Sequence, residues 1–345
     1  MTLPLRLEVS VIIPVHNGGN SFVKCLSSLA AAAPAPYEII VVADGDSDNS
    51  WVVAERFGVK VLRLPVCSGP AKARNVGAQN ATGDILFFVD ADVTIYPETI
   101  GRVEKIFCDR PELSAIIGSY DDEPGERNFL SQYKNLIHHY THQVASEEAF
   151  TFWGACGAIR REVFLSLGGF DESYRRPCIE DIELGYRLKK ANYRIGLCKD
   201  LQVKHLKRWT PISLLRAEFF YRALPWVELI WRDRTIKNDL NLGFTSRLSV
   251  VSVYLLLATL VAAWWLPGLL VVALGLSLLL LGLNLPVYRF FIAKRGFWFT
   301  LGVIPWHWFY YIYGGLAFVI GTIRHFWFQS GFSKINASTT SNISQ

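Results

Sequence analysis

Short apolar runs alternate with amphipathic segments over the first third of the chain. The apolar runs, which predict β-strands, cover residues 9–15, 37–43, 59–64 and 85–91. The amphipathic segments, which predict helices, cover residues 21–33, 49–57, 71–81 and 97–108. Apolar strands are typical of a parallel sheet buried on both faces, and regular alternation with helices covers those faces. The pattern therefore predicts an α/β domain with a Rossmann-like, mostly parallel sheet.

A different pattern occupies the last third of the chain. Residues 248–288 contain no Asp, Glu, Lys, Arg or His, and residues 296–323 contain only His307. As a helix the first run would reach about 60 Å, twice the hydrocarbon thickness of a bilayer. A turn at Pro267 and Gly268 would divide it. We therefore expect an α-helical transmembrane domain at 247–325, with spans near 248–266, 268–288 and 303–323.

The remaining segments flank this domain. Residues 211–246 interleave aromatic and apolar side chains with arginines, which predicts interfacial helices broken at Pro225. An amphipathic helix packed on the soluble domain is the alternative. Residues 326–345 are polar and predict a disordered tail. The expected soluble domain is thus residues 1–210.

Charge placement predicts the orientation of the spans. The N-terminus lacks the long apolar segment of a signal peptide, so the domain before the first span is expected in the cytoplasm. Arginines and lysines precede the first span and follow the second, which places both flanks on the cytoplasmic side. They are Arg232, Arg234, Lys237, Arg247, Arg289, Lys294 and Arg295. A third span would leave the tail on the far side, unless residues 297–305 only lie in the interface. We expect a multi-pass protein of the plasma membrane.

Composition adds three limits. The chain is 51% hydrophobic, which the C-terminal runs explain. Its net charge of +5 suits a protein lying against anionic lipid and does not indicate nucleic acid as a partner. The six cysteines are scattered, with no CxxC pair, and predict free thiols rather than a zinc site.

Acidic residues follow two of the predicted strands. Asp44 ends the run YEIIVVAD, and Asp90 and Asp92 end the run FFVDAD. The carboxyl ends of parallel strands meet at one edge of the sheet, where such folds bind ligands. Clustered carboxylates there suit a divalent cation held against phosphate oxygens. The sequence therefore predicts binding of a nucleotide diphosphate.

The order of motifs is more specific than any one of them. Over residues 8–210 the chain reads strand-PVHN, strand-ADGDSD, AKARNVG, strand-DAD, GGFDE and IEDIELGYRL. In this it resembles the family 2 glycosyltransferases of GT-A fold, here with C-terminal transmembrane helices. The resemblance implies a glycosyltransferase with a nucleotide-sugar donor, typically a UDP-sugar, and Mg²⁺ or Mn²⁺ as cofactor.

The resemblance also implies a donor site. Asp44 matches the carboxylate that accepts a hydrogen bond from the base, although Ala43 stands where the family often has a second Asp. Asp92 matches the metal ligand, and Asp90 lies nearer the ribose and the metal's waters. His205 is expected to be a further metal ligand or a hydrogen-bond donor to phosphate. The other residues expected near nucleoside or diphosphate are Pro14, His16, Asn17, Lys72, Arg74 and Asn75.

The acceptor site is implied in the same way. Glu180 and Asp181 face the acceptor, and Asp181 is the candidate general base for a single displacement with inversion. No carboxylate nucleophile is required. The segment HLKRW resembles the QxxRW box of processive and lipid-acceptor members, so Arg208 is expected near the diphosphate and Trp209 on an acceptor ring. The acceptor pocket is expected to include Phe152, Trp153, Gly154 and Ala155.

Together these features predict an inverting, metal-dependent transfer from a nucleotide sugar to a lipid or lipid-linked glycan at the cytoplasmic membrane face. Two alternatives stay open: a processive polysaccharide synthase, and a catalytically inactive nucleotide-sugar-binding membrane protein. The sequence does not identify the sugar, the base, the acceptor, the preferred metal or the oligomeric state.

Overall fold

The computed structural model describes residues 7–234 and 243–340, with side chains up to residue 327. The chain divides into two compact units, Met1–Pro211 and Ile212–Gln345. Each unit is described by itself.

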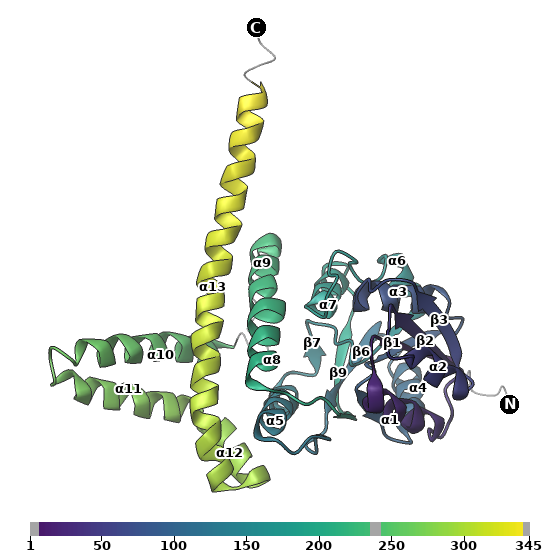
Figure 1. The fold of residues 1–345 in the computed structure, drawn as a ribbon, viewed down its shortest axis with the longest axis horizontal. Coiled ribbons are helices and arrows are strands. Elements are labelled where there is room, and N and C mark those ends of the chain that lie inside the picture. The colour runs from purple at the N-terminus through teal and green to yellow at the C-terminus, as the bar shows by residue number, and fades with distance from the viewer. Residues whose placement is uncertain (1–6, 235–242, 341–345) are drawn as a thin grey trace. The chain divides into compact units, whose positions relative to one another are not determined.

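One sheet organises the described part of the first unit (Figure 1). Its strands β3, β2, β1 and β4 form parallel ladders, as the sequence predicted. Strand β8 then runs antiparallel to β4 and β6, whereas β6 and β9 are parallel. The α/β class is confirmed, and the sheet as a whole is mixed. No regular alternation of strand and helix in the sequence marks its later strands. In spatial order the strands are β3 (Lys60–Leu64), β2 (Glu38–Asp44), β1 (Val9–Val15), β4 (Ile85–Val89), β8 (Cys156–Arg160), β6 (Ala115–Tyr120), β9 (Ile195–His205) and β5 (Val93–Ile95), with β7 (Glu148–Ala149) on β9.

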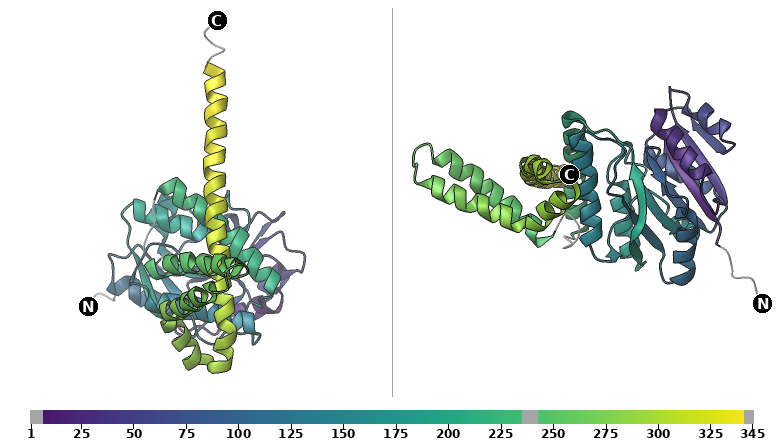
Figure 2. Two further views of the ribbon diagram at one scale, coloured as in Figure 1. Left: turned by 90° about the vertical axis from the view of Figure 1, so that its left-hand side faces the viewer. Right: turned by 90° about the horizontal axis from the view of Figure 1, so that it is seen from below.

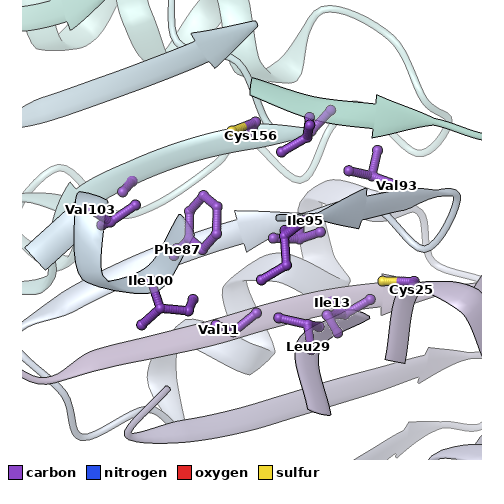
Figure 3. Close-up of a cluster of buried hydrophobic side chains, with 14 of the residues drawn as sticks. Val11, Ile13, Cys25, Leu29, Phe87, Val93, Ile95, Ile100, Val103 and Cys156 are labelled. Carbon is purple, nitrogen blue, oxygen red and sulfur yellow. The ribbon is translucent and has the colours of Figure 1, made fainter. Parts of the chain in front are cut away.

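Helices cover both faces of this sheet. On one face lie α1 (Gly19–Ala30), α2 (Ser50–Arg56) and α4 (Thr99–Asp109), and on the other α3 (Pro70–Gln79), α6 (Arg161–Ser166) and α7 (Glu180–Lys190). Helix α5 (Phe129–Val144) packs on β6 and β9. Successive residues of β1 alternate between the two cores, so Ile13 joins the first and Ile12 the second. Figure 3 shows part of the first core, in which Leu29 and Ile100 from helices lie with Phe87 and other strand residues. This two-sided burial explains why the strands are apolar throughout.

All the secondary structure described in the second unit is helical. It contains α8 (Pro211–Leu215), the π-helix η1 (Arg216–Ala223), α9 (Leu224–Asp233), α10 (Phe244–Ala262), α11 (Leu269–Leu283), α12 (Leu285–Arg295) and α13 (Phe297–Thr340). The predicted break at Pro225 is wrong, because η1 continues directly into α9 with helical backbone angles at Ala223. Pro225 lies in the first turn of α9, where a missing N–H is tolerated.

Two to three of these helices are apolar and long enough to cross a membrane. They are α10, α13 up to Trp327, and the pair α11 and α12 if that pair is counted as one span. The span predicted at 268–288 is not one straight helix, since the pair bends by 64° at Asn284. The Asn284 amide donates to the Leu280 carbonyl and to Ser249 Oγ, and Pro286 has no N–H to continue the helix.

The predicted tail also differs from the structure. Helix α13 continues to Thr340, and no proline or glycine interrupts residues 332–340. Only residues 341–345 of the predicted tail lie outside the described residues.

Gly185 positions helix α7 against the loop before β8. A Cβ there would lie 2.3 Å from the Phe152 amide nitrogen, and backbone cannot yield as a side chain can. We predict that Gly185→Ala lowers the thermal midpoint in detergent by about 5 °C, reflecting overpacking of roughly 2 kcal/mol. Gly196→Ala is the control, because its nearest atom belongs to the flexible Leu113 side chain at 3.0 Å. Equal midpoints for the two variants would contradict this close packing.

Candidate active site

The loops that follow β1 and β2 are tied together at the carboxyl edge of the sheet. Asn17, with φ 54°, accepts a hydrogen bond from the Ser47 amide at 2.8 Å. A ring nitrogen of His16 lies 2.8 Å from the Asp44 carbonyl oxygen, and the Gly19 amide donates to Asp48. His16 and Asn17 remain exposed at this edge, while Pro14 is half-buried in β1.

Asp44 organises the loop that leads into α3. Its side chain is buried, and its two oxygens accept hydrogen bonds from the amides of Ser68 (2.7 Å) and Gly69 (2.8 Å). The Cys67 thiol donates to it as well. The predicted contact with a base stays a prediction, and the structure adds that this carboxylate holds residues 67–69.

Arg74 connects the DAD motif to the acidic start of α7. It is 5% exposed, and its guanidinium donates to Asp90 Oδ1 at 2.7 Å and to Glu180 Oε1 at 2.8 Å. Burial lowers the pKa of Arg74, but the two carboxylates raise it by more, so the group stays charged. Lys72, two residues earlier on α3, is exposed.

Asp92 and His205 face each other where β5 pairs with β9. His205 Nε2 lies 3.7 Å from Asp92 Oδ2, and Lys207 Nζ lies 3.9 Å from the same oxygen. Burial raises the pKa of Asp92, but His205 and Lys207 outweigh it and bring that pKa to about 2. The His205 ring stacks on Tyr120 with centroids 4.3 Å apart, which fixes its orientation.

These two side chains fit a hard divalent cation that takes its other ligands from a substrate. Among the described residues no group of three or more His, Cys, Asp or Glu side chains could hold a metal by itself. An ionised carboxylate beside an imidazole nitrogen supplies two ligands, and phosphate oxygens or water can supply the rest. Asp90 has one carboxylate oxygen committed to Arg74.

Asp181 has the properties of a proton acceptor. Its carboxylate accepts hydrogen bonds from the amides of Gly154 (3.1 Å) and Ile182 (2.8 Å). Burial and the adjacent Glu180 raise its pKa to about 6, against the lowering effect of Gly154 and Arg74. Such a carboxyl group is ionised at neutral pH yet basic enough to take a proton.

Asn75 and Trp209 make contacts that the sequence did not predict. The Asn75 side chain contacts the backbone of Phe170 and the Glu172 carboxylate, so it holds the loop before α7. Trp209 is buried, with its ring under Lys207 and its backbone bonded to α5, so its ring is not presented for stacking on an acceptor. Arg208 is exposed.

Two functional features escaped sequence reasoning. The double ion pair of Arg74 joins residues 16 and 106 positions away, which no local pattern marks. Tyr120 supports His205 and also contacts the Trp153 ring, yet in the sequence it is an ordinary aromatic at the end of a strand. The one signal in the sequence that could have indicated Tyr120 is the position of an aromatic residue at the end of a strand, near the predicted site.

The mixed α/β fold of the first unit is of GT-A type. Residues 10–168 match the family "Glycosyl transferase family 2". The chain therefore contains a family 2 glycosyltransferase domain, and the enzyme class predicted from the sequence is confirmed for that domain.

Relatives share this domain. The chain is 39% identical over 94 residues to the uncharacterized glycosyltransferase YibD of Escherichia coli, covering 26% of this chain and 27% of YibD. It is 26% identical over 235 residues to a pre-mycofactocin glycosyltransferase of Mycobacterium tuberculosis, covering 65% of this chain and 45% of the relative. The chain thus spans less than half the length of these relatives.

Solved structures support the fold. The mannosyltransferase PcManGT from Pyrobaculum calidifontis, in complex with GDP-Man and Mn²⁺, is 20% identical with a TM-score of 0.57, covering 91% of this chain and 87% of PcManGT. TarS 1–349 of S. aureus, in complex with UDP-GlcNAc, is 21% identical with a TM-score of 0.50, covering 65% of each chain.

The pKa of Asp181 generates a prediction for the pH profile. If Asp181 is the base, its protonated form is inactive, so kcat/KM is expected to fall about tenfold per pH unit below pH 6 and to level off above it. The measurement is nucleotide release between pH 4.5 and 8 with donor, metal and acceptor held constant. A profile without an acid limb near pH 6 would contradict the assignment.

Arg74 generates a second prediction. Because its charge lowers the pKa of Asp181, Arg74→Gln is expected to move the acid limb up by about one pH unit. Arg74→Lys keeps a charge but cannot reach both carboxylates, so it should leave the limb near pH 6 while lowering kcat. An unshifted profile in Arg74→Gln would show that the guanidinium does not act on the base.

Proposed function

We propose that the protein is an inverting, metal-dependent glycosyltransferase that moves a sugar from a nucleotide-diphosphate sugar, a UDP-sugar, to a lipid or lipid-linked glycan at the cytoplasmic face of a membrane. The observation that carries the proposal is Asp181, a carboxyl with a pKa raised to about 6. Through Glu180 and Arg74 it is connected to Asp90 of the DAD motif. A base and a site for a diphosphate leaving group are the two requirements of a single displacement.

The donor would bind at the carboxyl edge of the parallel strands. His16, Asn17 and Lys72 are exposed there and can hydrogen-bond the nucleoside and the phosphates. Asp92 and His205 would hold Mg²⁺ or Mn²⁺, which when bound supplies positive charge to the departing diphosphate. That PcManGT carries GDP-Man with Mn²⁺ and TarS carries UDP-GlcNAc supports a nucleotide sugar.

The way Glu180 is engaged supports inversion. Its side chain is 4% exposed, one oxygen accepts from Arg74, and the other accepts from the Cys178 amide at 2.8 Å. A carboxylate held in this way is not free to attack the sugar. Asp181 would instead take the proton of the acceptor hydroxyl, which attacks the anomeric carbon directly.

The lipid acceptor is supported by the second unit. Two to three of its helices are apolar enough to span a membrane, and they follow the catalytic domain in the chain. An active site held beside a bilayer encounters acceptors that reside in it. The lysines and arginines that flank the apolar run favour the cytoplasmic side.

The proposal is tested by nucleotide release from a panel of UDP- and GDP-sugars, with purified protein in detergent, Mg²⁺ or Mn²⁺, and a membrane extract. Asp181→Asn is expected to lower kcat at least about 100-fold and to leave donor binding unchanged. Asp92→Asn is expected to weaken metal-dependent donor binding, and chelation of the metal should stop release. Asp109→Asn, on the exposed end of α4, is the matched control and should behave as the wild type.

The outcomes separate the readings. Near-normal turnover in Asp181→Asn would mean that the base is another group. Tight donor binding without release from any sugar would favour an inactive nucleotide-sugar-binding protein. Absence of donor binding would disprove the assigned donor site.

A further inference from the structure

Helices α10 and α11 form a hairpin of bilayer length. The 19 residues of α10 span about 28 Å, close to the roughly 30 Å hydrocarbon core. Its far end carries Trp264 and Trp265, which are 86% and 72% exposed. Aromatic residues at a membrane interface are typical of span ends. Across the distal half of the hairpin, apolar side chains such as Leu260 and Val271 are exposed.

Among the described residues, helix α13 contacts this hairpin in the first half of α10, up to Tyr254, and at the end of α11. Tyr254 donates a hydrogen bond to the Ile312 carbonyl at 2.7 Å, and Gly315 packs against Tyr254 and Val250. Tyr311 donates to Asn284 Oδ1 at 2.7 Å, at the end of α11. The contacts of α13 thus gather around residues 311–315. Figure 1 and the right-hand view of Figure 2 show the hairpin projecting sideways from α13.

The hairpin and helix α13 run transverse to each other, so they cannot both cross the same bilayer. Either the hairpin or α13 is therefore not a span. Helix α13 runs over 44 residues, from Phe297 to Thr340, or about 66 Å, which exceeds the hydrocarbon core. The hairpin matches that thickness and contains no Asp, Glu, Lys, Arg or His after Arg247. Length therefore favours the hairpin.

The helix packed along α13 leads to the same assignment. In α9, Trp231 donates its indole N–H to Thr322 Oγ1 at 2.9 Å, and Val227 packs on Gly321. Glu228 pairs with Arg324 at 3.4 Å, and both side chains are about half exposed. An exposed ion pair between two adjacent helices suits the headgroup region and is expensive in hydrocarbon.

We propose that the hairpin α10–α11 alone crosses the membrane, and that α13, with α9 beside it, lies in the plane of the interface at the hairpin's base. The surface that α13 offers to the lipid is rich in aromatic residues, including Trp298, Phe309 and Trp327. Two spans place the C-terminus on the same side as the glycosyltransferase domain, in place of the predicted third span and the tail on the far side. The inference rests on the membrane location in the proposed function and on none of its chemistry.

The test is a topology measurement on the full chain in a bacterial host. Alkaline phosphatase, active only after export to an oxidising compartment, is fused after Gln345 or inserted between Pro267 and Gly268. The C-terminal fusion is expected to be inactive, and the insertion at the hairpin tip active. Green fluorescent protein fused after Gln345 should fluoresce, which excludes loss of the C-terminal reporter as the cause. Phosphatase activity of the C-terminal fusion would overturn the proposal.

A matched pair of arginine substitutions tests the depth of the two helices. Leu257 in α10 and Leu316 in α13 are similarly exposed, at 39% and 45%. Leu257→Arg places a charge near mid-bilayer and should reduce the membrane-inserted fraction roughly tenfold, whereas Leu316→Arg should leave it near the wild type. Equal losses in both variants would show that α13 is also in hydrocarbon. Recovery of the wild type in the soluble fraction would overturn the membrane location, and nucleotide release would still test the chemistry separately.

Discussion

The buried charge of Arg74 is the constraint on which the glycosyltransferase domain depends. A guanidinium removed from water is tolerable only when paired, and here it is paired with Asp90 and Glu180. Those partners belong to the loop after β4 and to the first turn of α7, so one side chain fixes the distance between the proposed donor and acceptor sites. The same guanidinium explains why residue 154 is a glycine, since a Cβ there would lie 3.0 Å from Cζ of Arg74. The Gly154 amide in turn donates a hydrogen bond to Asp181.

Two carboxylates in one domain acquire different chemistry from their surroundings. Asp92 lies beside His205 and Lys207, which hold its pKa at about 2, so it is ionised at every physiological pH and suits a cation. Asp181 is half-buried next to the negative Glu180, and its pKa rises to about 6, which suits proton transfer. The pKa values of Asp92 and Asp181 differ because each carboxylate has different neighbours. Both sets of neighbours come from other segments of the chain, so the difference exists only in the folded domain.

The sequence predicted those features that depend on local pattern. Strand β1 was predicted at its observed bounds, Val9–Val15, because burial on both faces leaves a continuous apolar run. The insertion of β8 between β4 and β6 could not be predicted, since pairing over long separations leaves no mark in either segment. Trp209 was expected to contact a ligand but is buried. The sequence around an aromatic loop residue does not show whether its side chain is buried or exposed. Asn284 likewise breaks an apolar run through contacts that only the folded unit creates.

The second unit shows why composition alone miscounts membrane spans. Both α10 and α13 are apolar and long enough to cross a membrane by composition, and the contacts between helices add what composition lacks. With three spans, Arg324 and Lys334 would be exported, against the tendency of basic residues to stay in the cytoplasm. With the hairpin as the only insertion, these residues share one side with Arg247, Arg289, Lys294 and Arg295. The charge distribution and the contacts of α13 then agree, because both set the hairpin apart as the part of the unit that leaves the cytoplasmic interface.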